Sequence, residues 1–133
     1  MDAATRRAVR ARAEDRCEYC RLREVHAPFP RFHVEHIRPK KHGGTDDLKN
    51  LCLACGQCNL HKSSKLTGID PETDDITVIF HPRDHEWGEH FQFERAVIIG
   101  LSSVGRTTVR VLNMNDDERC QLRQALIDNG ELD

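Results

Sequence analysis

Two Cys-x-x-Cys pairs constrain the fold of this 133-residue chain more than any other feature of its sequence. The first pair is Cys17 and Cys20, the second is Cys55 and Cys58, and 34 residues separate them. A spacing of two residues lets both thiolates of a pair reach the same tetrahedral ion, and four thiolates are a common ligand set of structural zinc. The two pairs therefore predict one zinc site that ties two distant segments together.

Cys52 offers an alternative ligand, because Cys52 and Cys55 have the same Cys-x-x-Cys spacing. We prefer Cys58 as the fourth ligand, since Gly56 permits a tight turn between Cys55 and Cys58 whereas Cys52 lies in an apolar segment. Cys52 and Cys120 are then predicted to be buried thiols that pack as small hydrophobic residues. A redox-active cysteine pair is the other interpretation that the spacing leaves open.

The composition indicates the cellular compartment of the protein. Residues 1–7 lack the apolar core of a secretory signal, and no stretch has the roughly 20 apolar residues of a membrane span. We therefore expect a cytoplasmic protein without a membrane partner, and in that compartment six cysteines favour a metal site over disulfides. Aromatic residues make up 5% of the chain, which predicts a modest apolar core of the kind that structural metal reinforces.

The elements around the cysteines predict a ββα unit. Apolar, β-rich segments at 32–37 and 51–54 predict two strands, and residues 40–47 between them predict a loop. Residues 56–66 have the polarity and spacing of a helix that ends before Gly68. The order strand, loop, strand and helix, with cysteines at its edges, is that of a ββα unit.

Downstream of residue 67 the sequence predicts further strands and a final helix. Residues 104–112 fit a helix by their apolar spacing but a strand by their β-branched content. Asn115, with Glu118 three residues later, predicts the start of the last helix. The predicted strands lie at 76–80, 91–94 and 97–101.

Charge is unevenly distributed along the chain. Residues 1–66 contain 14 Lys and Arg against 8 Asp and Glu, whereas residues 67–133 contain 6 against 14. The basic half predicts a surface for a polyanion, with a solvated charged surface as the alternative. Residues 3–16 predict an N-terminal helix whose arginines are either solvated or face phosphate. The acidic half could limit access of nucleic acid or bind a partner protein.

Four polar residues within the ββα segment suit phosphodiester hydrolysis. Glu35 offers a carboxylate and Asn59 an amide oxygen, and a hard divalent cation prefers oxygen ligands. His36 can take a proton from water near neutral pH, and the side-chain carbonyl of Asn50 could orient its ring. Neighbouring residues of a strand point to opposite faces, so Glu35 and His36 share a site only if the strand ends or bulges there. Alternative ligands are His33, His42 and His61.

The same residues give the chain a resemblance to the HNH endonuclease family. Residues 17–66 contain the pattern of that family, which is Cys-x-x-Cys, Glu35-His36, Gly43-Gly44, Asn50-Leu51, and Cys-x-x-Cys with Asn59 directly after it. Further segments are similar, less sharply, to a bacterial HNH subgroup, and this similarity favours a helix at 104–112. These segments are 68–73, Pro82-Arg83, Trp87, His90-Phe91 and Gly105-Arg106.

The resemblance implies an α+β fold with a ββα-metal (His-Me finger) core, a four-cysteine zinc knuckle, an N-terminal helix and a small α/β C-terminal extension. We expect the core at 1–67 and the extension, packed on it, at 68–133. The resemblance places His36 as the general base, Asn50 as the orienting asparagine and Asn59 as a ligand of a Mg²⁺-type ion, the Asn-ended variant that zinc-knuckle junction resolvases also have.

Two departures from the family pattern concern the metal. The family more often has Asp at the position of Glu35, so the reach of this ligand differs by one methylene. Asn59 is a weaker ligand than His, which favours Mg²⁺ or Mn²⁺ over softer ions.

The predicted function is that of a metal-dependent DNA endonuclease or nickase. The alternative is a catalytically inactive, zinc-stabilised DNA-binding or adaptor module, but such a module has no reason to retain all four of the polar residues described above. Basic side chains near them are predicted to contact DNA phosphates. These are Arg38, Lys40, Lys41, Lys62 and Lys65.

Overall fold

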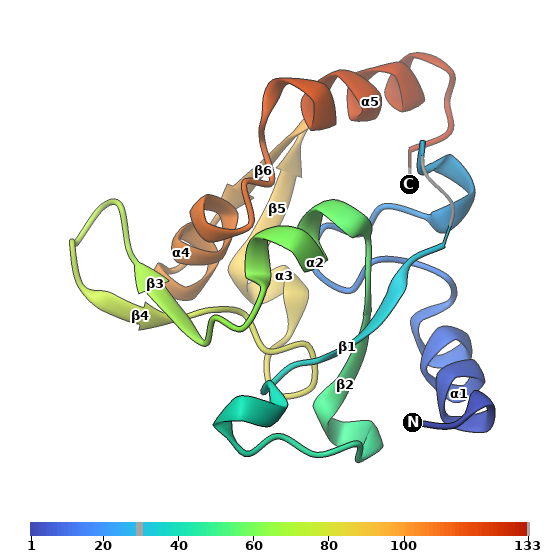
Figure 1. Ribbon diagram of the computed structural model, residues 1–133. Coiled ribbons are helices and arrows are strands. Elements are labelled where there is room, and N and C mark those ends of the chain that lie inside the picture. Colours follow the sequence, from blue (N-terminus) through green and yellow to red (C-terminus); the bar gives the residue numbers. More distant parts are fainter. Residues whose placement is uncertain (29–30, 133) are drawn as a thin grey trace. The chain divides into compact units, whose positions relative to one another are not determined.

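The computed structural model describes residues 1–28 and 31–132, and within them the chain forms two compact units. The first unit comprises Met1–Leu66 with His81–Glu86, and the second comprises Thr67–Phe80 with Trp87–Asp133. These residues contain five α-helices and three two-stranded antiparallel sheets, so the predicted α+β class is confirmed (Figure 1). None of the described helices has the length and apolar character needed to cross a membrane. The predicted division after residue 67 stays a prediction.

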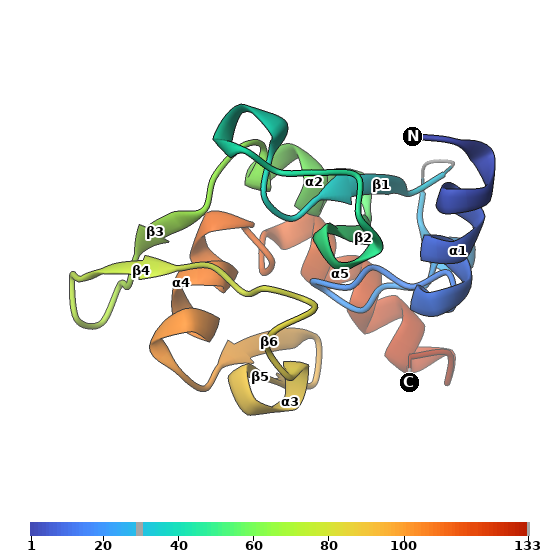
Figure 2. The same ribbon diagram turned by 90° about the horizontal axis from the view of Figure 1, so that it is seen from below.

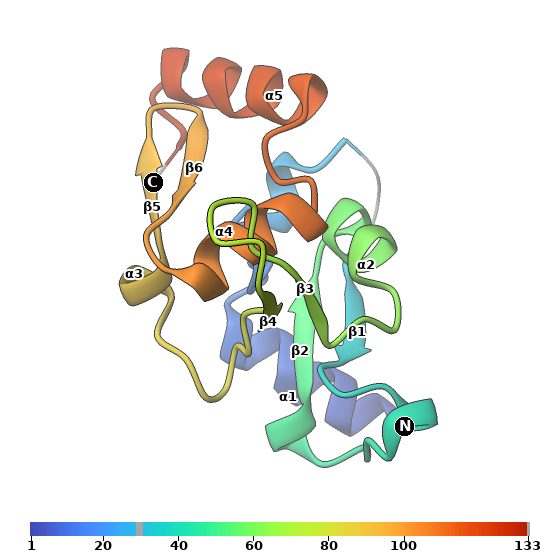
Figure 3. The same cartoon turned by 90° about the vertical axis from the view of Figure 1, so that its left-hand side faces the viewer.

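The first unit is built on a hairpin of two short strands. Strand β1 (His33–His36) pairs with β2 (Leu51–Ala54), and the ladder runs from His33 opposite Ala54 to His36 opposite Leu51 without a bulge (Figure 3). Helix α2 (Gly56–Lys62) follows β2 directly, as the ββα prediction requires. Every residue of β2 is buried, which makes this strand the centre of the core of the unit.

Helix α1 (Ala3–Ala13) begins at Asp2, whose side chain accepts a hydrogen bond from the amide of Thr5 at 2.8 Å. Two of its arginines attach it to the hairpin. Arg10 donates to the carbonyl oxygen of Phe32 at 2.8 Å, and Arg12 donates to that of Leu51 at 2.5 Å. Part of the basic charge of the first half is therefore used for packing and is not free to face phosphate.

Helix α2 is shorter than the predicted helix at 56–66. It ends at Lys62, because Ser63 has φ 50° and ψ −128°, a conformation that cannot continue a helix. We read Gly68 as a helix stop, but Gly68 lies in strand β3 (Thr67–Ile69), which the sequence did not predict. A Cβ at Gly68 would lie 2.4 Å from the Val111 side chain, so glycine permits close packing here.

In the second unit, the three predicted strands and β3 form two hairpins (Figure 2). Strand β3 pairs with β4 (Ile76–Val78), and β5 (Phe91–Glu94) pairs with β6 (Val97–Gly100) after the short helix α3 (Trp87–His90). The ambiguous segment at 104–112 is helical and forms α4 (Ser103–Val111), which packs on β6. The last helix is α5 (Asp117–Asp128).

The start of α5 differs from the prediction. Asp116, and not Asn115, caps this helix, by accepting a hydrogen bond from the amide of Arg119 at 2.8 Å. Asn115 instead pairs with the backbone of Ile98 in β6, accepting from its amide at 2.9 Å and donating to its carbonyl at 2.8 Å. The Asn115 side chain, which the local sequence pattern predicted to cap α5, is thus engaged in a tertiary contact with β6.

A buried ion pair joins the β3–β4 turn to α4. Asp70 has no exposed surface, and Arg106 contacts both of its carboxylate oxygens, at 3.1 Å and 2.8 Å. Thr73 and the amide of Glu72 supply two further hydrogen bonds to the same carboxylate. The hydrogen bond from Arg106 and the other donors lower the pKa of Asp70 to about 2.

Candidate functional site

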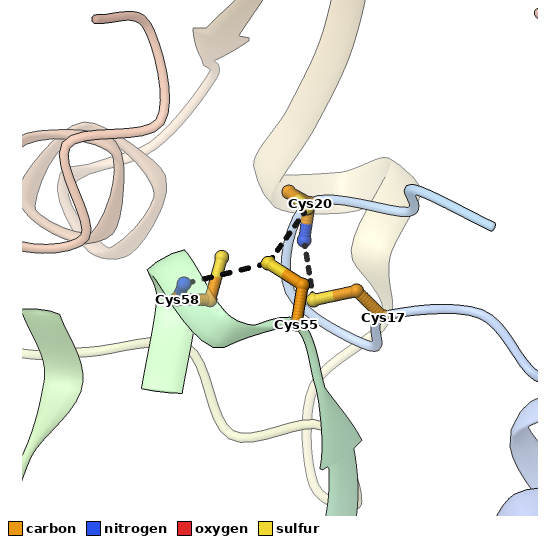
Figure 4. A group of neighbouring side chains, drawn as sticks. All are labelled: Cys17, Cys20, Cys55 and Cys58. Carbon is orange, nitrogen blue, oxygen red and sulfur yellow. Dashed lines mark hydrogen bonds between the residues drawn. The ribbon is translucent and has the colours of Figure 1, made fainter. Parts of the chain in front are cut away.

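The four predicted zinc ligands lie together (Figure 4). Cys17 and Cys20 come from the loop after α1, Cys55 and Cys58 come from the start of α2, and all four are buried. Their sulfur atoms all lie within 4.8 Å of one another, and Cys20 Sγ is 3.7 Å from Cys55 Sγ. Tetrahedral zinc with Zn–S bonds of about 2.3 Å separates its sulfurs by about 3.8 Å. The cluster therefore has the size and chemistry of a site for one zinc ion.

Both cysteine pairs have the same local geometry. The amide of Cys20 donates to Cys17 Sγ at 3.5 Å, and the amide of Cys58 donates to Cys55 Sγ at 3.4 Å. Such donors stabilise a thiolate. Burial raises the pKa of Cys17 and Cys58 well above the usual value, whereas the hydrogen bond from Cys17 lowers the pKa of Cys55. A bound cation would hold all four as thiolates, because a metal ligand must be deprotonated.

The choice of Cys58 over Cys52 agrees with the position of the cluster, but one of the two reasons given for it, the need for glycine in the turn, is wrong. Gly56 lies at the first position of α2 without a positive φ, and a Cβ there would meet no atom within 4 Å. The turn between Cys55 and Cys58 therefore does not need glycine. The other reason holds, because Cys52 lies in the apolar strand β2, where it is paired with Glu35.

Two residues that the sequence analysis missed attach the first cysteine pair to β2. The amide of Glu18 donates to the carbonyl of Leu53, and the Glu18 carboxylate accepts from the amide of Leu53, both at 2.8 Å. Arg83 binds the other oxygen of the same carboxylate. Burial lowers the pKa of Arg83 to about 10. The resemblance of Pro82-Arg83 to the bacterial subgroup was the one signal that could have indicated this role.

Glu35 points into the core of the first unit, with 7% of its side chain exposed. Its Oε1 atom accepts hydrogen bonds from the Tyr19 hydroxyl at 2.5 Å and from Cys52 Sγ at 3.3 Å, and its Oε2 atom lies 3.5 Å from Lys62 Nζ. Burial raises the pKa of Glu35, and Lys62, Tyr19 and Cys52 oppose this shift. Burial also raises the pKa of Tyr19 and of Cys52, which keeps both as neutral donors.

His36 is paired with a residue that the sequence analysis did not consider. Its Nε2 atom lies 2.6 Å from Oδ1 of Asp46, in the loop between β1 and β2, and this hydrogen bond lowers the pKa of Asp46. A carboxylate only accepts, so Nε2 carries a hydrogen and the lone pair of a neutral ring is on Nδ1. The ring is 24% exposed, and Nδ1 has no hydrogen-bond partner among the described residues.

Strand β1 ends at His36, which is one of the two conditions set above for Glu35 and His36 to serve one site. Their partners nevertheless differ. Glu35 faces the buried Tyr19 and Lys62, while His36 faces the loop and Asp46. The Lys62 side chain links the two environments, because its Nζ, which lies near Glu35, also donates to the carbonyl oxygen of His36 at 3.2 Å.

We expect from the sequence that the side-chain carbonyl of Asn50 contacts the His36 ring. In the structure it does not. That oxygen accepts from the amide of Arg38 at 2.9 Å, and Nδ2 donates to the carbonyls of Arg38 at 3.0 Å and Thr45 at 2.8 Å. Asn50 therefore closes the loop that carries Asp46. A Cβ at Gly44 would lie 1.7 Å from the Arg38 carbonyl oxygen, so this closure requires glycine there.

Asn59 lies on α2, three residues before Lys62, and residues at this spacing share a face of a helix. Lys62, one helical turn after Asn59, contacts Glu35 in β1. Its side chain forms no hydrogen bond with any residue that the structure describes. A carboxylate and an amide oxygen are suitable donors for a hard cation. The described part of the chain contains no metal-binding cluster around His33, His42 or His61.

The predicted phosphate contacts divide into two groups. Lys62 is 1% exposed and is committed to Glu35 and to the His36 carbonyl, so our prediction that it contacts DNA is wrong for this arrangement. The other four residues are exposed. Three come from the β1–β2 loop, near Asp46, and one follows α2: Arg38, Lys40, Lys41 and Lys65.

Comparison with protein families gives a match to HNH endonuclease over residues 17–65. The comparisons with curated proteins and with solved structures gave no match. The matched segment begins at Cys17 and contains both cysteine pairs, the β1–β2 hairpin, its loop and α2. Members of this family are usually nucleases. Residues 17–65 of this chain, 49 of its 133 residues, match the model of the HNH endonuclease family.

Proposed function

We propose that the chain is a metal-dependent DNA endonuclease or nickase in which His36 is the general base. The observation that carries this proposal is the pairing of His36 with Asp46 at the end of β1. The pairing leaves Nδ1 of a partly exposed ring free to accept a proton. A site built for DNA binding alone would have no use for this arrangement.

His36 would act through Nδ1 on a water molecule at the scissile phosphate. As Nδ1 takes the proton the ring becomes a cation, and the Asp46 carboxylate on Nε2 stabilises the positive charge that forms. Asn50 and Gly44 contribute indirectly, because they close the loop that holds Asp46 in place. Such a base typically accelerates a reaction by about 10²–10⁴-fold.

Glu35 and Asn59 are the proposed ligands of a catalytic Mg²⁺ or Mn²⁺ ion. When bound, the ion supplies positive charge that stabilises the phosphorane and the departing 3′ oxygen. Glu35 would offer Oε2, since Tyr19 and Cys52 already occupy Oε1. Lys62 Nζ lies 3.5 Å from Oε2, so a bound ion would share this oxygen with the ammonium.

The cysteine cluster is proposed to hold zinc in a structural role. Its four ligands are buried, which leaves no open position for a substrate, and a closed site of this kind stabilises a fold without taking part in chemistry. The exposed basic side chains of the β1–β2 loop and of the segment after α2 are proposed to contact DNA phosphates. These are Arg38, Lys40, Lys41 and Lys65.

One observation favours the alternative, a zinc-stabilised DNA-binding module without activity. Lys62, Tyr19 and Cys52 satisfy the Glu35 carboxylate without any metal ion. The two functions are separated by incubating the protein with supercoiled, linear, single-stranded and branched DNA, in Mg²⁺ or Mn²⁺ and in EDTA. Cleavage that needs the divalent ion and is lost in His36→Ala supports the nuclease. Binding without cleavage of any substrate supports the module.

A further inference from the structure

We propose that Tyr19 is a positioning residue for Glu35 and thereby couples the zinc site to the catalytic ion site. This inference rests on the proposed role of Glu35 as a ligand of the catalytic ion. Tyr19 lies between Cys17 and Cys20, so its backbone belongs to the loop that the zinc ion would hold. Its hydroxyl reaches Oε1 of Glu35 at 2.5 Å.

The position of Tyr19 is fixed from two directions. On one side Cys17 and Cys20 belong to the four-sulfur cluster, and on the other the amide of Glu18 is bonded to Leu53 in β2. The Tyr19 side chain is fully buried, which prevents its hydroxyl from exchanging Glu35 for water. A change in the cysteine loop would therefore move the donor that holds the carboxylate.

The two carboxylate oxygens of Glu35 have different partners. Oε1 accepts from the neutral donors Tyr19 and Cys52, which orient the carboxylate without neutralising its charge. Among the residues that the structure describes, the partner of Oε2 is the Lys62 ammonium, at 3.5 Å. One oxygen is thus used for orientation, and the other keeps its negative charge directed at a cation. Groups that orient a metal ligand in this way typically change metal affinity by about 10–100-fold when removed.

The chain offers a direct optical probe of this contact, because Tyr19 is its only tyrosine and Trp87 its only tryptophan. In a Trp87→Phe background, tyrosine fluorescence reports Tyr19 alone. Trp87 lies in the second unit, where it stacks with Phe91 and Phe93, so phenylalanine preserves the aromatic contacts. Binding of a cation to Oε2 withdraws charge from the carboxylate and weakens its hydrogen bond with Tyr19. We expect the tyrosine signal to change and to saturate as Mg²⁺ is added to the zinc-loaded protein.

The test combines this titration with a direct measurement of Mn²⁺ affinity by electron paramagnetic resonance, at constant pH. Tyr19→Phe should retain about one zinc per chain and bind Mn²⁺ roughly 10-fold or more weakly. Cys120→Ser, a thiol outside the cluster, is the control and should bind Mn²⁺ as the wild type does. Cys52→Ala removes the second donor to Oε1 and should weaken Mn²⁺ binding in the same direction.

The outcomes distinguish this inference from the proposed function. The positioning role is overturned if Tyr19→Phe binds Mn²⁺ with unchanged affinity. It is also overturned if tyrosine fluorescence does not change when Mg²⁺ is added. Both conclusions hold even if the protein cuts DNA. If Tyr19→Phe binds Mn²⁺ more weakly while the wild-type protein cuts no DNA, the positioning role is supported and the nuclease function is refuted. If Tyr19→Phe loses its zinc, the Mg²⁺ response of the unchanged Tyr19 and the Mn²⁺ affinity of Cys52→Ala decide the question.

Discussion

His36 and Asp46 form a hydrogen-bonded pair, with Nε2 of the imidazole 2.6 Å from Oδ1 of the carboxylate. Asp46 lies ten residues after His36, in the loop that Asn50 and Gly44 close. The partner that orients the proposed base therefore comes from the loop itself, and Asn50 acts on His36 only through the conformation of that loop.

Asp46→Asn should reduce the rate constant for DNA cleavage by about 10–100-fold, because an amide does not fix the tautomer of His36 or stabilise its cation as a carboxylate does. The matched control is Asp47→Asn, a neighbouring exposed carboxylate whose side chain caps no helix. Asp47→Asn should cut at nearly the wild-type rate. Single-turnover cleavage kinetics measure both variants, and a wild-type rate in Asp46→Asn would remove Asp46 from the mechanism.

Zinc removal should unfold the first unit. Cys17→Ser or Cys58→Ser takes away one of four clustered thiols, whereas Cys120→Ser leaves the cluster intact. Structural zinc supplies folding free energy on the order of 10 kcal/mol in small zinc peptides. Elemental analysis should find about one zinc per chain in the wild type and in Cys120→Ser, and thermal unfolding should show a large loss of stability in the other two. Zinc retained in Cys58→Ser and lost in Cys52→Ser would mean that Cys52 is the fourth ligand.

Gly44→Ala should destabilise the loop that carries Asp46. Its Cβ would lie 1.7 Å from the Arg38 carbonyl oxygen and 2.9 Å from Asn50 Nδ2, so the loop has to open. We expect a loss of about 1–3 kcal/mol in the free energy of unfolding, typical of overpacking, together with slower cleavage. Gly56→Ala is the control, since its Cβ meets open space at the start of α2. Equal unfolding free energies for the two variants, measured in urea, would show that Gly44 has no special role.

Acid should weaken the second unit through Asp70. Its pKa is about 2 in the folded chain against an ordinary value of 3.8, and the main cause is the hydrogen bond from Arg106. A lowered folded pKa stabilises the fold fully above the unfolded value of 3.8, and this contribution is lost as the pH falls towards 2. Arg106→Lys should therefore lower the melting temperature most near neutral pH, with a difference from the wild type that shrinks below pH 4. Trp87 fluorescence follows this unit, and a difference that does not depend on pH would contradict the assignment.

The sequence predicted the elements whose signals are local. The two cysteine pairs, the β1–β2 hairpin and the start of α2 were recognisable because spacing and apolar pattern determine them. What it missed depends on contacts between distant residues. Arg83 contacts Glu18, which lies 65 positions earlier in the sequence. Asn115, predicted to cap α5, instead forms a hydrogen bond with the backbone of Ile98. Strand β3 exists only because β4 pairs with it.

The polar site shows the same limit. The sequence indicated which residues carry the chemistry but not which atoms they meet. Glu35 was recognisable as a carboxylate beside His36, yet the sequence contained no sign that Tyr19 and Lys62 enclose it. Lys62 was read as a surface lysine because charged side chains are rarely buried, and its ion pair with Glu35 and its hydrogen bond to the His36 carbonyl account for its burial.

The most direct test of the account is DNA cleavage by His36→Ala beside the wild type, under single-turnover conditions in Mg²⁺ and in Mn²⁺. The variant removes the ring that pairs with Asp46 but none of the clustered cysteines, so its zinc content and thermal stability should stay close to those of the wild type. Cleavage that falls by about 10²–10⁴-fold, with zinc retained, is the predicted result. A correctly folded, zinc-loaded variant that keeps more than about a tenth of the wild-type rate would show that His36 is not the general base.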